Sequence, residues 1–124
     1  MAALDRFRSD DRRALEQFYR RVAGPEAAER LRLTWQWERR QNPAAREQVA
    51  TPWIVREGTA IVGACDGMPV RLVMSGRDVS GTWITDPVVA SERDRQGLHE
   101  MLIRAWHRDT EVTLAAGIAE TTRV

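Results

Sequence analysis

A chain of 124 residues with 43% hydrophobic and 30% charged side chains has the composition of one small globular domain. Its 19 basic residues against 18 acidic ones give a net charge of +1, which excludes a polybasic nucleic-acid arm, and no apolar run is long enough to cross a membrane. The single cysteine, Cys65, excludes an internal disulfide framework, and the first residues lack the apolar segment of a secretory signal. We therefore expect a cytoplasmic protein.

The N-terminal third predicts two helices. The acidic run 9–11 suits a helix start, and apolar residues at helical spacing follow it until Gly24-Pro25. A second helix fits residues 26–40, because Asn42-Pro43 disfavours helix beyond that point.

From residue 51 onward the pattern is typical of strands. Short β-type runs at 53–55, 60–64 and 70–74 are followed by turn signals at Glu57-Gly58, Asp66-Gly67 and 75–78. A fourth strand is expected over 82–89. Pro87 indicates a bulge or an edge within it, because proline cannot donate to a strand ladder.

The clearest helix covers residues 97–108, where apolar side chains recur at i, i+3, i+4, i+7 and i+8. A last short strand follows at 111–117. A strand, a helix and a strand in series indicate a right-handed parallel crossover. The sequence therefore predicts one α+β domain over residues 1–124, with helices in 1–43 and a mixed sheet in 51–124.

The turn between the fourth strand and the last helix has the most promising chemistry. The strand ends near Val89, polar residues follow, and a helix begins near Gln96-Gly97. Amide N–H groups at a helix start, with a glycine that permits close approach, form an anion site. Arg93 and Arg95 are placed to add charge-assisted contacts to phosphate oxygens.

The run from Val89 to His99 resembles the signature of the GNAT superfamily of acyl-CoA N-acyltransferases, in which a strand ends in Val-x-Pro-Glu-x-Arg-x-x-Gly-x-Gly before an amphipathic helix. The run 61–63 and the strand at 83–86 are also similar to that family, and the resemblance covers residues 35–124. It implies a central mixed, mainly antiparallel sheet with N-terminal helices and one β-α-β crossover, here lacking the family's final helix and hairpin.

The resemblance also implies an activity: transfer of an acetyl or other acyl group from acyl-CoA to the amine of a small molecule or peptide. Acetyl-CoA or a related acyl-CoA would be held by Val88, Val89, Arg93, Arg95, Gln96, Gly97, Leu98 and His99. An amide near Val88 or Val89 would polarise the thioester carbonyl. Asp86 is the first candidate for the general base that accepts the amine proton, and Glu92 is the second. No metal site is expected, because His99 and His107 have no acidic or thiol partner at ligand spacing.

Two alternatives stay open. Asp94 and His99 replace an arginine and a small residue of the signature, which favours a degenerate, non-catalytic acyl-CoA-binding or scaffold domain. An arginine-rich nucleic-acid-binding module is a second alternative, disfavoured by the charge of +1. Without the family's final hairpin, the strand near 111–117 should have an open edge, which predicts a homodimer, an ill-folded chain or a fragment.

Overall fold

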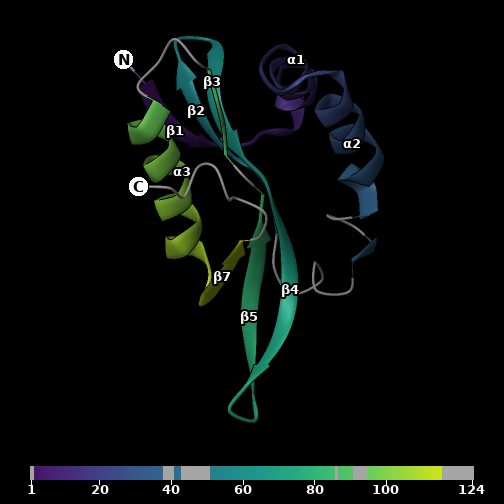
Figure 1. Ribbon diagram of the computed structural model, residues 1–124, viewed down its shortest axis with the longest axis vertical. Coiled ribbons are helices and arrows are strands. Elements are labelled where there is room, and N and C mark those ends of the chain that lie inside the picture. The colour runs from purple at the N-terminus through teal and green to yellow at the C-terminus, as the bar shows by residue number, and fades with distance from the viewer. Residues whose placement is uncertain (1, 38–40, 43–50, 86, 91–94, 116–124) are drawn as a thin grey trace.

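The computed structural model describes residues 2–37, 41–42, 51–85, 87–90 and 95–115. Figure 1 shows the strands with α3 on one side and with α1 and α2 on the other. The predicted α+β class is confirmed. In chain order the elements are β1 (Ala2–Arg6), the 3₁₀ turn η1 (Ser9–Asp11), α1 (Arg12–Ala23), α2 (Pro25–Gln36), β2 (Trp53–Glu57), β3 (Ala60–Cys65), β4 (Gly67–Met74), β5 (Arg77–Ile84), β6 (Val88–Val89), α3 (Arg95–Asp109) and β7 (Val112–Ala115).

The strands form two ladders, in the orders β1-β2-β3-β6 and β4-β5-β7. All neighbouring pairs are antiparallel except β5 and β7, which run parallel on either side of α3 in the chain. The predicted parallel crossover is therefore confirmed. No helix in the described ranges is both long and apolar enough to span a bilayer.

A bulge joins the two ladders. Ala64 pairs with Val88 and Gly67 pairs with Ile84, so two residues on one strand face three on the other. The extra residue falls between Ile84 and Val88, as a β-bulge requires. The Thr85 N–H still bonds the Asp66 carbonyl at 3.0 Å, which keeps the strands together up to this point. The bulge predicted from Pro87 is confirmed.

Three details differ from the sequence prediction. Residues 2–6 form an edge strand that was not predicted, since the charges of Asp5 and Arg6 conceal its alternation. Asp66-Gly67 is no hairpin turn, because the next reversal comes only after Met74. The expected strand 82–89 is two strands, of which the first begins at Arg77.

Helix α3 packs its apolar stripe into the core, as its periodicity predicts. Leu98, Leu102 and Ala105 are buried, and Trp106 is only 2% exposed. The Trp106 indole donates to the Cys65 carbonyl at 2.9 Å. A Cβ on Gly67 would lie 2.7 Å from the Trp106 ring, so a glycine is needed where β4 begins.

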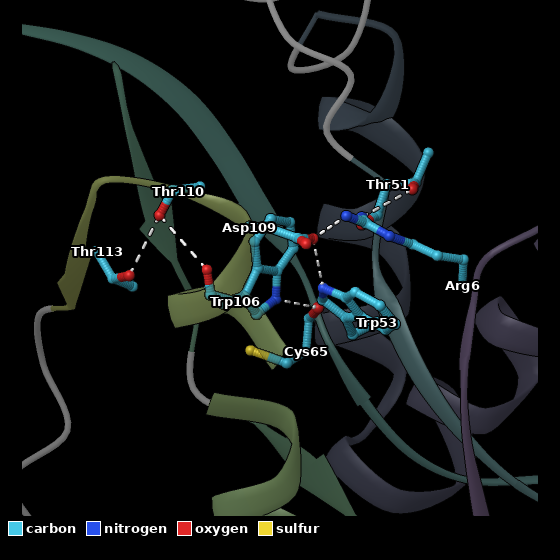
Figure 2. A network of polar contacts seen from close by, with 8 residues as sticks. All are labelled: Arg6, Thr51, Trp53, Cys65, Trp106, Asp109, Thr110 and Thr113. Carbon is cyan, nitrogen blue, oxygen red and sulfur yellow. Dashed lines mark hydrogen bonds and ion pairs between the residues drawn. The ribbon is translucent and has the colours of Figure 1, made fainter. Parts of the chain in front are cut away.

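The end of α3 is tied to the first two strands by a polar network (Figure 2). Asp109 forms an ion pair with Arg6 of β1, and the Trp53 indole of β2 donates to the same carboxylate at 2.9 Å. The Arg6 guanidinium also lies 4.2 Å from the centre of the Trp53 ring and donates to Thr51. These contacts join α3 to two segments that lie 56 and 103 residues away from Asp109 in the sequence.

A second charged cluster links β2 to η1. Arg56 of β2 forms ion pairs with Asp5 and with Asp11, whose side chain is only 12% exposed. Burial opposes ionisation of Asp11, but the hydrogen bonds from Arg56 and from the Arg8 amide outweigh it, together with the charges of both arginines. The pKa of Asp11 therefore lies below its usual value.

Asp11→Asn is expected to lower the free energy of unfolding by about 1–3 kcal/mol at neutral pH, because Arg56 loses a largely buried partner. The lowered pKa means that the carboxylate stabilises the fold above about pH 4 and loses this effect as the pH falls through the native pKa. Urea unfolding at about pH 7 and about pH 3 should thus give a smaller difference from the parent protein at the lower pH. Asp10→Asn, on an exposed neighbour, is the control. Equal costs of Asp11→Asn at both pH values would contradict the assignment.

Candidate functional site

Because of the bulge, the backbone N–H and C=O of Val89 point away from β3, toward the open edge of the sheet. The Ala90 N–H bonds the Val62 carbonyl at 2.9 Å, which makes these two residues a hydrogen-bonded pair. Pairs alternate along an antiparallel ladder, so Val89 and Gly63 form a non-hydrogen-bonded pair. The N–H and C=O of Val89 therefore point away from β3, whereas those of Val88 point toward it. Since β6 is the last strand of its ladder, Val89 presents both groups to an edge that no other described strand occupies.

Helix α3 follows β6 in the chain. It packs against β6, and its first turn starts at Arg95. N–H groups in the first turn of a helix have no partner within the helix and point along its axis toward the N-terminal end, where they favour anions. The strand edge at β6 and the start of α3 thus lie on adjoining elements.

The residues predicted to bind the acyl-CoA donor differ in their exposure to solvent. Gln96 is exposed, Gly97 and His99 are half-buried, and Leu98 is buried, so only the backbone of Leu98 is suited to contact a ligand. Of the remaining candidates, Asp86, Glu92 and Arg93 lie outside the described residues, as does the side chain of Arg95.

A cavity of about 220 Å³ opens on the α1 and α2 side of the bulge. We call it the bulge cavity. It is lined by Tyr19 of α1, by Ala27, Arg30, Leu31 and Thr34 of α2, and by Asp66 and Thr85 of the sheet.

The bulge cavity and the Val89 edge are neighbours in the sheet. Asp66 and Thr85 face each other across the strands, directly before the extra residue of the bulge. Side chains alternate between the two faces of a strand, so Asp66 and Ala64 share one face. Gly63 belongs to the opposite face, because a Cβ there would meet Leu102 of α3 at 3.4 Å. The cavity therefore opens on the face away from α3, beside the start of β6.

Asp66 is the functional candidate that the sequence analysis missed, because it was interpreted as part of a turn. Its side chain is 5% exposed, and its Oδ1 accepts the Gly67 N–H at 2.9 Å. An acidic residue within the otherwise apolar run 60–70 was the one available signal. A buried carboxylate is costly unless it is paired or hydrogen-bonded, and the Gly67 N–H is one of the partners of Asp66.

The described residues contain no group of three or more His, Cys, Asp or Glu side chains arranged to hold a metal ion.

Neither a protein family model nor a curated protein matches the sequence. Solved structures do match its fold. A ribosomal-protein-alanine N-acetyltransferase from Brucella melitensis is 16% identical with a TM-score of 0.65, over 99% of this chain and 86% of that one. A GNAT family acetyltransferase from Brucella melitensis, in complex with acetyl-CoA, is also 16% identical with a TM-score of 0.65, over 94% and 76%.

An aminoglycoside N-acetyltransferase in complex with CoA is 11% identical with a TM-score of 0.64, over 98% of this chain and 80% of that chain. At these identities the likeness is one of fold. The chain therefore has the fold of the GNAT acetyltransferases, as the resemblance in residues 89–99 implies.

Proposed function

We propose that this protein is an N-acyltransferase that transfers an acetyl or another acyl group from acyl-CoA to an amine. The observation that carries the proposal is the outward-facing backbone of Val89, directly after the bulge and on a strand against which α3 packs. The fold shared with acetyltransferases in complex with CoA and with acetyl-CoA supports it.

The described residues fit an acyl-CoA donor in two respects. The Val89 edge offers one donor and one acceptor to an extended chain of amide groups, as a neighbouring strand would. The first turn of α3 suits the negative charges of a diphosphate. The contacts of Arg93 and Arg95 with those charges stay a prediction from the sequence. The donor supplies the acyl group as an activated thioester.

The Val89 N–H donates to the thioester oxygen as that oxygen gains negative charge, which stabilises the transition state. The amine nitrogen forms a bond to the carbonyl carbon, and the bond from that carbon to sulfur breaks. Asp86 or Glu92 accepts the proton that the amine loses, and the departing thiolate takes up one proton. The bulge cavity holds the acceptor amine beside the Val89 edge.

The proposal extends to the partners. The acceptor is a small molecule or a peptide with an amine, and the protein acts in the cytoplasm. A homodimer would form at β7, which is the outer strand of the β4-β5-β7 ladder.

Two measurements with the full chain test the proposed function. Acetyl-CoA at about 100 times its Kd should raise the free energy of unfolding by about 2.7 kcal/mol, seen as a higher Tm. Thiol release from acetyl-CoA should then depend on an added amine. Stabilisation without thiol release would favour the non-catalytic acyl-CoA-binding alternative, and the absence of both would contradict the proposal.

A further inference from the structure

The threonines and the aspartate that line the bulge cavity are bonded within the protein. Thr34 donates to the Arg30 carbonyl at 2.8 Å. Thr85 donates to the Asp66 carbonyl at 3.3 Å. The Asp66 carboxylate accepts the Gly67 N–H at 2.9 Å, and Asp66 takes part in a further interaction within the protein. These side chains therefore hold the walls of the cavity together, and a ligand that bound to them would compete with these bonds.

Apolar groups from two helices form the rest of the wall. Ala27 and Leu31 are four residues apart in α2, so they lie on the same side of that helix. The ring of Tyr19 in α1 adds carbon surface. Arg30 is exposed, and an exposed arginine covers apolar surface with its carbon stem while its charged head stays in water. A ligand inside the cavity therefore meets mostly carbon atoms.

Ala27 is the lining residue whose size most directly limits the cavity. Leu31 and Tyr19 belong to the buried core cluster, so other side chains hold them in place. Ala27 is half-buried against that cluster, and its side chain ends at Cβ. Leucine at this position would add three carbon atoms. Each is about as large as a water molecule, so together they would fill roughly 90 Å³ of a cavity of about 220 Å³.

We propose that the acceptor is a small primary amine with a short apolar chain that lies against Ala27 and Leu31, and that Ala27 sets the longest chain accepted. This proposal rests on the proposed function and names the substrate class of the same site. The volume of about 220 Å³ is roughly that of seven water molecules in the liquid, so it suits a molecule of about seven heavy atoms. A second charged group on the chain would lose its hydration and compete with the bonds that the lining already makes.

Steady-state kinetics with straight-chain amines test the proposal. The full chain is assayed for thiol release at saturating acetyl-CoA with ethylamine, butylamine, hexylamine and octylamine. In the parent protein, kcat/KM should rise by up to about 4-fold for each added CH₂ group, and the rise should stop at about seven heavy atoms. Diaminobutane and γ-aminobutyrate have four carbon atoms, like butylamine, but carry a second charge, so their kcat/KM should be at least about 10-fold lower. A flat series, or a charged acceptor that exceeds butylamine, would overturn the proposal.

Two substitutions at one position assign the length limit. Ala27→Leu should make the best chain about two to three carbon atoms shorter, and Ala27→Val should shorten it by less. A merely structural role would lower the rates with all amines alike and leave the best length unchanged. Ala14→Leu, at an exposed position of α1, is the matched control and should retain the parent's series. If either Ala27 variant is folded, as judged by its Tm, and keeps the parent's length limit, the proposal is wrong.

Calorimetric titration of the protein saturated with CoA separates this inference from the proposed function. Longer amines should bind more tightly than ethylamine to the parent protein, up to the same limit, and this measurement needs no turnover. Thiol release that does not depend on chain length would refute this inference alone. A lack of thiol release with any amine would refute the proposed function, while the titration would still decide the chain preference.

Discussion

Val89→Pro is expected to lower kcat for acyl transfer by about 10²–10³-fold while the protein remains folded. The substitution removes one backbone N–H, and the loss of one donor to a developing oxyanion has an effect of that size. The N–H of Val89 points away from β3, so proline removes no ladder bond. The measurement is amine-dependent thiol release at saturating acetyl-CoA, with the Tm as the check on folding.

Val88→Pro is the matched control, one residue earlier in the same strand. The Val88 N–H points toward Ala64, so its removal breaks a ladder bond and should lower the stability. The two variants should thus separate catalysis from folding. A folded Val89→Pro protein with the parent's kcat would show that Val89 does not polarise the thioester.

Trp106→Ala should have the largest effect on stability, with a cost of about 3–5 kcal/mol in the free energy of unfolding. The ring is 2% exposed, lies against Gly67 and donates to the Cys65 carbonyl. The substitution leaves a cavity between α3 and the sheet and removes the partner of a buried carbonyl. Urea unfolding measures the cost.

Trp83→Ala provides the comparison, because Trp83 is 42% exposed on β5. Its loss should cost well under half as much, since less apolar surface returns to water. Equal costs for the two variants would contradict the position of Trp106 in the core.

The sequence predicted the elements with strong local signals. The stripe of α3 and the Gly24-Pro25 boundary between the first two helices lie where periodicity and breaker residues put them. The bulge could be predicted from Pro87, because the lack of an amide N–H donor is a property of that residue alone. β1 was not predicted, because it is an edge strand whose charged residues interrupt the alternation of apolar and polar side chains.

The candidate site was only partly predictable. The Val89 edge follows from the strand and the bulge, both of which have local signals. The bulge cavity unites residues 19, 30, 66 and 85, and its existence depends on how α1 and α2 pack on the sheet. Asp66 was interpreted as a turn residue because Asp-Gly is common in turns. Its role as a cavity residue depends on contacts distant in sequence. The predicted bases Asp86 and Glu92 stay predictions.

The most direct test of the account is the amide NMR spectrum of the isotope-labelled protein during titration with acetyl-CoA and, separately, with CoA. If the Val89 N–H bonds the thioester oxygen, its proton signal should move downfield with acetyl-CoA and much less with CoA. The Val88 signal, whose N–H already bonds within the ladder, should move little with either. A Val89 signal that stays in place at saturating acetyl-CoA would contradict the account.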